Sequence, residues 1–175
     1  ALIPSAVIIF ISSFKKMSAT MMVLIGIGLM YVFSAFTMFL KINAEPEKLE
    51  EVYTWSVGTL TGTDWSAILP LLCASVVILA AMLILSNRIN VLSAGDNMSV
   101  ALGVNPLKLR IICFLLVSVA VAVAVCFTGT IGFVGLVGPH IARLFVGSNM
   151  KRLIPASALI GALMVLCADI GVRMI

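Results

Sequence analysis

Few residues of this sequence could do chemistry, and those few form two pairs with helical spacing. His140, the only histidine, lies three residues before Arg143, and Asp169 lies four residues before Arg173. A histidine can relay protons or bind a metal. An acid placed four residues before a base favours an ion pair on one helix face. What each pair does depends on the elements that hold it and on its neighbours.

His140 has no chemical partner in its own stretch of sequence. Residues 132–143 read GFVGLVGPHIAR and contain no second histidine, no cysteine and no carboxylate. A proton relay or a metal site would need such a group, so we expect His140 to make a structural hydrogen bond and Arg143 to reach the headgroups. GxSxG, HExxH and Walker A motifs are also absent from the sequence. We therefore predict no catalytic residue, no metal site and no cofactor.

The composition sets the class of protein. The chain is 62% hydrophobic and 10% charged, whereas about 25% of the residues of a soluble domain are charged. Continuous apolar runs recur that are long enough to cross about 30 Å of hydrocarbon, and their continuity excludes a membrane β-barrel. We predict one all-α transmembrane domain over 1–175, part of a larger protein. Its expected spans are 17–40, 66–86, 107–128, 132–146 and 153–175, after the end of another span at 1–14.

Basic residues gather in alternate connections between these spans. The connections at 15–16, 87–110 and 143–152 together hold eight Lys and Arg, whereas the other side holds three. The positive-inside rule places the eight-charge side in the cytoplasm. The acidic segment 41–65 is then an external loop, and 87–106 is a cytoplasmic loop. Because topology accounts for the basic residues, no nucleic-acid partner is predicted.

The glycines of the 132–146 segment indicate close helix packing. Gly132, Gly135 and Gly138 are three residues apart, and small residues on one stripe let a neighbouring backbone approach. Pro139 removes a hydrogen bond and is expected to kink the segment. Fifteen residues give a helix of about 22 Å. The segment is therefore too short to cross alone, and the turn before it is expected below the outer surface.

The cytoplasmic loop predicts a contact with another protein. Residues 91–106 show apolar positions interrupted by Gly95 and Gly103 and closed by Asn105 and Pro106, which indicates two short amphipathic helices separated by a turn. Exposed apolar side chains on such a loop favour a protein partner. The alternative is a membrane-surface helix, which would carry more Lys and Arg.

For two further features, the residues alone leave two interpretations open. Ser18, Ala19 and Thr20 form either an ordinary helix N-cap or the lining of a narrow cytoplasmic constriction. Asp169 and Arg173 form either a structural ion pair near the outer interface, or a site where Arg173 presents its charge to an external partner.

Four blocks of the sequence together resemble the iron-compound and cobalamin ABC importer permeases, which take up ferric siderophores, haem or cobalamin. The blocks are GTIGFVGLVGPHIARLFVG (129–147), LSAGDNMSVALGVNPLKLR (92–110), WSVGTLTGTDW (55–65) and ADIGVR (168–173). The resemblance covers nearly the whole chain, which would match the end of the fourth span through the ninth of a ten-span permease. It implies a homodimer in a bacterial or archaeal cytoplasmic membrane, with an ABC ATPase inside and a substrate-binding protein outside.

The resemblance also implies roles for particular residues. Ser18, Ala19 and Thr20 would form the cytoplasmic gate, and Arg173 would dock the binding protein. Gly132, Gly135, Gly138 and Pro139 would pack the short eighth span. The residues expected to couple to the ATPase are Leu92, Ala94, Gly95, Asp96, Ala101, Leu102 and Gly103.

The implied function is that of a transport subunit working by alternating access, with ATP hydrolysed by the separate ATPase and not by this chain. One rival is a secondary, proton-coupled transporter, which needs buried ionisable residues along a path. Another is an intramembrane enzyme centred on His140. Loss of transport on deleting an ATPase separates the first rival from the importer.

Overall fold

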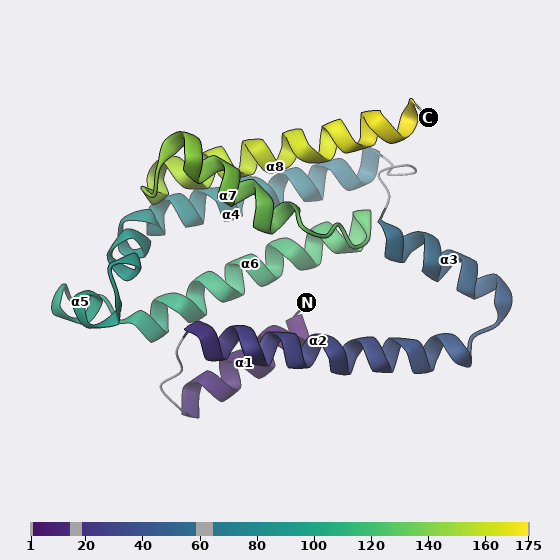
Figure 1. The fold of residues 1–175 in the computed structure, drawn as a ribbon, viewed down its shortest axis with the longest axis horizontal. Coiled ribbons are helices and arrows are strands. Elements are labelled where there is room, and N and C mark those ends of the chain that lie inside the picture. Colours follow the sequence, from purple (N-terminus) through teal and green to yellow (C-terminus); the bar gives the residue numbers. More distant parts are fainter. Residues whose placement is uncertain (1, 15–18, 59–64, 175) are drawn as a thin grey trace.

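The computed structural model describes residues 2–14, 19–58 and 65–174, and in this part of the chain it contains eight helices. Figure 1 shows the long helices running side by side, so the predicted all-α bundle is confirmed. The helices are α1 (Leu2–Phe14), α2 (Ala19–Ile42), α3 (Pro46–Val57), α4 (Trp65–Ser93), α5 (Asp96–Ala101), α6 (Pro106–Thr128), α7 (Val134–Val146) and α8 (Met150–Arg173).

Four helices are long and apolar enough to cross a membrane. Their spans, with mean hydropathies from 2.1 to 2.9, are Thr20–Ile42, Ile68–Ser93, Pro106–Thr128 and Met150–Arg173. Few side chains of these helices are buried. Across all the described ranges, the buried hydrophobic residues are Ile8, Leu109, Ala142 and Leu153. A helix in lipid has no need to hide apolar side chains, so this exposure fits a membrane bundle.

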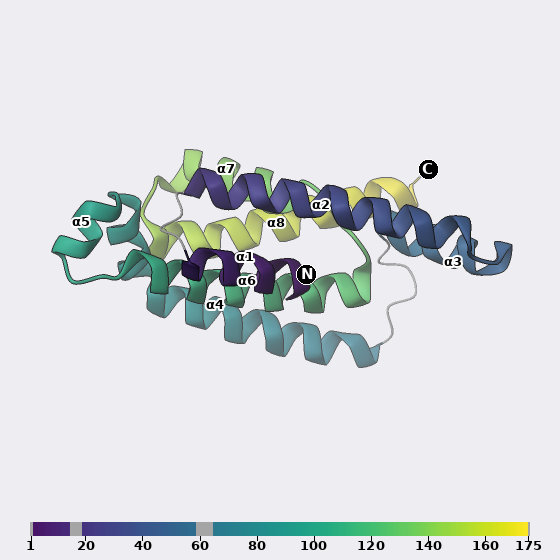
Figure 2. The ribbon, with the colours of Figure 1, turned by 90° about the horizontal axis from the view of Figure 1, so that it is seen from below.

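The bundle has two distinct ends, which Figures 1 and 2 show at opposite extremes of the long axis. We call the end that carries α5 the α5 end, and the end that carries α3 the α3 end. Asn90 of α4 bonds Asn149 before α8 at the α5 end, and Thr130 bonds Ser56 of α3 at the other. Basic residues divide unequally between the ends. The α5 end has Arg88, Lys108, Arg110, Arg143, Lys151 and Arg152, and the α3 end has Lys41, Lys48 and Arg173.

The helices depart from the expected spans in two places. First, α4 continues to Ser93, well past residue 86. Polar side chains do not have to end a helix once the helix has left the hydrocarbon region of the membrane. Second, the 41–65 loop contains the helix α3, which starts with Pro46 at its first position and ends at Gly58 with φ of 79°. Proline at the start and glycine just past the end are common helix boundaries.

The short helix α7 begins later than the glycine pattern predicts. Its N-cap, Phe133, has φ of 65°, a left-handed conformation that stops a helix. Gly132 therefore lies outside α7, so the expectation of a three-glycine stripe on one helix is wrong. The 13 residues of α7 extend about 20 Å, short of a membrane span.

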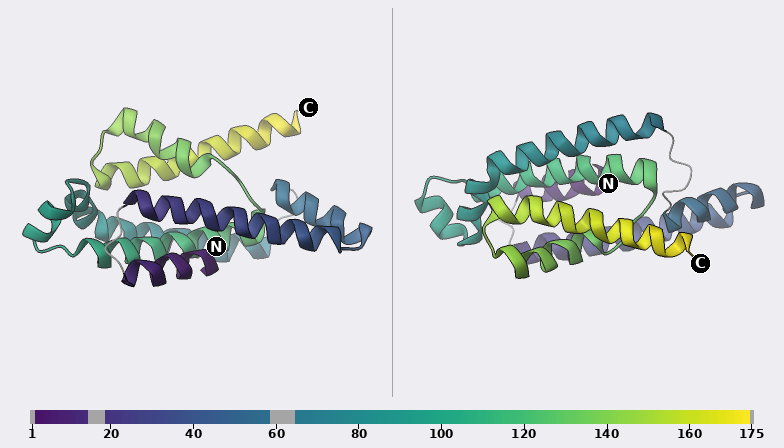
Figure 3. Two further views of the ribbon diagram at one scale, coloured as in Figure 1. Left: turned by 60° about the horizontal axis from the view of Figure 1, so that its bottom comes forward. Right: turned by 90° about the horizontal axis from the view of Figure 1, so that it is seen from above.

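Of the three glycines, Gly138 is the one that packs closely. A Cβ placed on Gly138 would lie 3.6 Å from Cα of Gly161 in α8, whereas a Cβ on Gly132 or Gly135 would meet no atom within 4 Å. α7 packs along α8 (Figure 3), and Gly138 marks the place where the two backbones are near each other. Pro139 lies inside α7, one residue beyond this contact.

Candidate functional site

The candidate site is the short helix α5, which projects from the end of the bundle (Figures 1 and 2). Gly95, with φ of 109°, turns the chain out of α4 and directly precedes α5. At the other end, Gly103 has φ of 76°. The N–H of Val104 donates to the carbonyl of Ser99 at 2.8 Å, and the N–H of Gly103 donates to that of Val100 at 3.0 Å. These bonds form a Schellman-type ending, so glycines fix both limits of α5.

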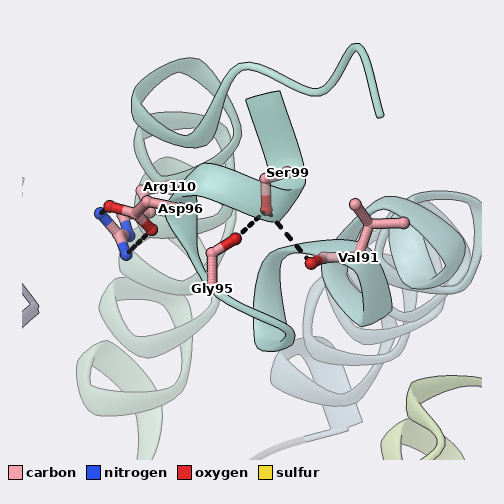
Figure 4. A network of polar contacts seen from close by, with 5 residues as sticks. All are labelled: Val91, Gly95, Asp96, Ser99 and Arg110. Carbon is pink, nitrogen blue, oxygen red and sulfur yellow. Dashed lines mark hydrogen bonds and ion pairs between the residues drawn. The ribbon is translucent and has the colours of Figure 1, made fainter. Parts of the chain in front are cut away.

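Ser99 holds α5 against the end of α4. Its side chain is fully buried, and its hydroxyl lies 2.8 Å from the carbonyl of Gly95 and 3.1 Å from that of Val91 (Figure 4). Val91 belongs to the last turns of α4. A buried hydroxyl needs hydrogen-bond partners, and here those partners tie α5 to the helix from which it emerges.

Asp96 and Arg110 hold α5 on its other side, as Figure 4 shows. Nη2 of Arg110 donates to Oδ1 of Asp96 at 2.7 Å, and Nη1 donates to Oδ2 at 3.1 Å. Such bidentate pairs add geometric specificity to charge attraction. Because Arg110 lies in the first turns of α6, the pair connects α5 to the next span. α5 is therefore attached to both α4 and α6.

α5 and the residue after it expose apolar side chains beside the polar Asp96 and Asn97. Met98, Val100 and Leu102 are 55%, 63% and 61% exposed, although they lie at the end of the bundle that carries most of the basic residues. A cavity of about 630 Å³ lies beside Val100, and its lining includes Asp96, Pro106 and Arg110. Exposed apolar side chains on a rigid projection fit a protein partner.

The structure distributes the residues expected to couple to a partner over the end of α4, the turn after it, α5, and the residues that follow α5. Leu92 lies in α4 and is half-buried, Ala94 and Gly95 form the turn, and Asp96 and Ala101 lie in α5. Leu102 and Gly103 directly follow α5. The expectation of two separate short helices is wrong in one respect: the first is the end of α4, because α4 runs without a break to Ser93.

A second connection at the α5 end joins α4 to the start of α8. Nδ2 of Asn90 donates to Oδ1 of Asn149 at 3.2 Å, and Oδ1 of Asn90 accepts the N–H of Met150 at 2.8 Å. Asn149 caps α8 by accepting the N–H of Lys151 at 3.1 Å. An asparagine before a helix suggests a cap, but no sequence rule pairs residues 90 and 149.

At the α3 end, the end of α3 lies against the turn between α6 and α7. Oγ1 of Thr130 donates to the carbonyl of Ser56 at 2.5 Å. A Cβ on Gly58 would lie 2.9 Å from the carbonyl oxygen of Thr130. This close backbone contact connects the external-loop helix to the segment that leads into α7.

Arg173, the expected docking residue, lies at the α3 end and pairs with Asp169. Its Nε donates to Oδ2 of Asp169 at 2.9 Å, and the Arg173 side chain is 62% exposed. Within the described part of the chain, no bond engages its two Nη groups. Arg173 therefore forms the ion pair while much of its side chain stays exposed. A structural ion pair and a site that presents the charge of Arg173 to an external partner are compatible interpretations.

The other expected site residues lie apart from α5 or outside the described residues. Of the gate residues, Ser18 lies outside the described ranges, Ala19 starts α2, and Thr20 follows it with an exposed side chain. His140 and Arg143 are both exposed in α7. The hydrogen bond expected for His140 is not present among the residues that the structure describes.

The fold defines a multi-pass helical membrane protein with a short helix, α5, projecting from one end. The FecCD transport family matches residues 1–175. The chain therefore belongs to the FecCD transport family, and it is a multi-pass inner-membrane protein.

Relatives of the chain include named permeases with different cargoes. The "Probable iron chelatin transport system permease protein" of Helicobacter pylori J99 is 36% identical over 175 residues, covering 100% of this chain and 54% of that protein. The "Cobalamin import system permease protein BtuC" of Halobacterium salinarum is 37% identical over 152 residues, covering 87% and 41%. The chain thus spans about half the length of the curated relatives that it matches.

A solved structure of an inward-facing metal-chelate type ABC transporter has the same fold. It matches with a TM-score of 0.85 and 35% sequence identity, over 93% of this chain and 53% of that one. The helices described above therefore have the arrangement seen in one half of a transporter chain.

Proposed function

We propose that this chain is part of the permease subunit of a binding-protein-dependent ABC importer. The cargo would be an iron chelate, such as a ferric siderophore or haem, or cobalamin. Membership of the FecCD transport family and the likeness to a metal-chelate transporter structure support this proposal. The chain would supply the pathway and work by alternating access, with a second copy of the permease completing a homodimer.

The observation that carries the proposal is the attachment of α5. An ABC permease must receive mechanical work from a separate ATPase, because it does not hydrolyse ATP itself. α5 offers that ATPase an apolar surface of Met98, Val100 and Leu102. Ser99 and the Asp96–Arg110 pair fasten it to two helices. A cytoplasmic ABC ATPase that binds α5 could move α4 and α6 together.

The distribution of charge supports the orientation that this requires. Six of the basic residues of the described ranges lie at the α5 end and three at the α3 end, so the positive-inside rule favours the α5 end as cytoplasmic. Arg173 then faces outward, where its exposed guanidinium can bind a carboxylate of a substrate-binding protein. Ser18, Ala19 and Thr20 would form the gate at the cytoplasmic start of α2.

The test of this proposal is ATPase binding by the full-length permease. Leu102→Glu and Val100→Glu place a charge on the apolar surface of α5, and Val57→Glu is the matched control. Val57 is 80% exposed at the α3 end. The α5 variants should lose the ATPase on co-purification and should lose uptake, whereas Val57→Glu should keep the ATPase. Normal ATPase binding by both α5 variants would refute the proposed site.

The energy source that drives uptake distinguishes the proposed importer from the rival function, a proton-coupled transporter. Uptake into vesicles should require ATP and the ATPase, and it should persist when a protonophore removes the proton gradient. The cargo is identified in the same assay with ferric siderophore, haem and cobalamin, each supplied with its binding protein. Uptake that follows the proton gradient and ignores ATP would favour the rival.

A further inference from the structure

The side chains of Asn90 and Asn149 join the end of α4 to the start of α8. We call this pair the asparagine latch. Nδ2 of Asn90 donates to Oδ1 of Asn149 at 3.2 Å, and Oδ1 of Asn90 accepts the N–H of Met150 at 2.8 Å. A carboxamide can donate and accept at the same time, so one side chain contacts both the cap and the backbone of α8.

Within the latch, Asn149 has a separate local role. It caps α8 by accepting the N–H of Lys151 at 3.1 Å, as an asparagine at a helix start commonly does. What Asn90 adds is a connection between two membrane-spanning helices. That connection lies at the α5 end, where the basic residues and the projecting helix also lie.

The latch is adjacent in sequence to the attachment of α5. Asn90 bonds the start of α8, and the next residue, Val91, accepts a hydrogen bond from Ser99 of α5 at 3.1 Å. Two consecutive residues in the last turns of α4 therefore hold α5 and α8. A displacement of α5 that moves Val91 must also act on Asn90.

α8 extends from the latch to the far end of the bundle. Its 24 residues give a length of about 36 Å, and its last turn carries Asp169 and Arg173, which form an ion pair. α7 lies against α8 at Gly138 and Gly161. A displacement of the start of α8 would therefore also move α7 and the end of α8 that carries Arg173.

We propose that Asn90 is a positioning residue for transport, which transmits the displacement of α5 to α8 through its hydrogen bonds with Asn149 and Met150. The proposal rests on the proposed function, because the displacement is produced by the ATPase. Two hydrogen bonds between neutral groups are individually modest in net energy. They can hold the helices in register without preventing either helix from moving.

The test uses the full-length permease assembled with its ATPase and loaded binding protein in proteoliposomes. Asn90→Leu keeps the size of the side chain and removes both hydrogen bonds. Asn149→Ser keeps a residue able to cap α8 and removes the amide oxygen to which Asn90 donates, while the N–H of Met150 remains. Ser75→Ala is the control, because Ser75 also lies in α4 but bonds only the carbonyl of Leu72 in its own helix, at 2.9 Å.

Assembly, basal ATP hydrolysis and substrate taken up per ATP are measured for each variant. We expect both latch variants to assemble and hydrolyse ATP at the basal rate, while uptake per ATP falls about fivefold. The double variant should be no worse than the poorer single variant, because both remove the same contact. Ser75→Ala should match the unmodified permease.

Three results would overturn the role of Asn90. The first is an unchanged ratio of uptake to ATP in Asn90→Leu or in Asn149→Ser. The second is loss of assembly in both, which would make the latch a folding contact. The third is an additive loss in the double variant. Failure of the proposed function is seen separately, since the unmodified permease would then show no ATP-dependent uptake.

Discussion

Gly129 and Gly58 meet backbone to backbone at the α3 end. A Cβ on Gly129 would lie 3.0 Å from Cα of Gly58 and would overlap the carbonyl oxygen of Trp55. Gly129 also has φ of 71° and ψ of −162°, a backbone region essentially confined to glycine that costs other residues about 1–3 kcal/mol. The contact therefore fixes the end of α3 onto the turn between α6 and α7, and it admits no side chain at Gly129.

Replacing Gly129 tests this contact. Gly129→Ala should lower the free energy of unfolding by about 2 kcal/mol or more, since the methyl group both clashes and strains the backbone. Thermal unfolding of the purified permease in detergent measures the change. Gly132→Ala, in the same connection but with no atom within 4 Å of its Cβ, should unfold like the unmodified protein. Equal melting temperatures for both variants would contradict the contact.

The Asp96–Arg110 pair predicts a rescue by charge reversal. The Arg110 and Asp96 side chains are 21% and 51% exposed, so we expect the pair to contribute about 1 kcal/mol. Asp96→Arg and Arg110→Asp should each weaken ATPase binding roughly fivefold, because α5 loses its attachment to α6. The double variant should recover most of the affinity. The Kd of the permease for the ATPase measures this, and a double variant as weak as either single one would argue against the pair.

The close contact of α7 with α8 at Gly138 and Gly161 limits the size of the side chain that position 138 can hold. Gly138→Ala should be tolerated, because its Cβ would lie at an ordinary contact distance of 3.6 Å from Gly161. Gly138→Leu should destabilise the protein by about 1–3 kcal/mol by pushing α7 from α8. Gly135→Leu, on a face where no atom lies within 4 Å, is the control. Thermal unfolding that ranks the two leucine variants equally would show that α7 does not pack through Gly138.

The exposed guanidinium of Arg173 predicts salt-dependent binding of the external protein. Arg173→Glu should weaken that binding at least about tenfold at low salt, and the difference should shrink as salt rises, because screening weakens exposed charge pairs. Asp169→Asn should retain binding, since it leaves the two Nη groups in place. Titration of the binding protein onto permease in nanodiscs measures both effects. Unchanged affinity in Arg173→Glu would remove Arg173 from the docking surface.

Local features of the fold were predictable from the sequence because they depend on neighbouring residues. Asn105 caps α6 by accepting the N–H of Lys108 at 3.1 Å, with Pro106 at the first helical position. Gly103 ends α5, as a glycine beyond a helix end is expected to do. The apolar runs likewise predicted the four long helices, since the length of a span is set by the thickness of the bilayer.

The contacts between elements were not predictable, since they depend on which elements meet. The Asn90–Asn149 bond and the Thr130–Ser56 bond join residues far apart in the sequence. Gly132 shares its spacing with Gly138, yet Phe133 ends the helix between them. The helix α3 could have been predicted from Pro46, from apolar residues at Leu49, Val52 and Tyr53, and from Gly58.

Phe133 combines a left-handed backbone with a side chain that is 84% exposed. A glycine would adopt this conformation freely, whereas a phenylalanine adopts it at a cost of about 1–3 kcal/mol. The ring therefore lies on the surface of the described helices, where acyl chains or another polypeptide can contact it.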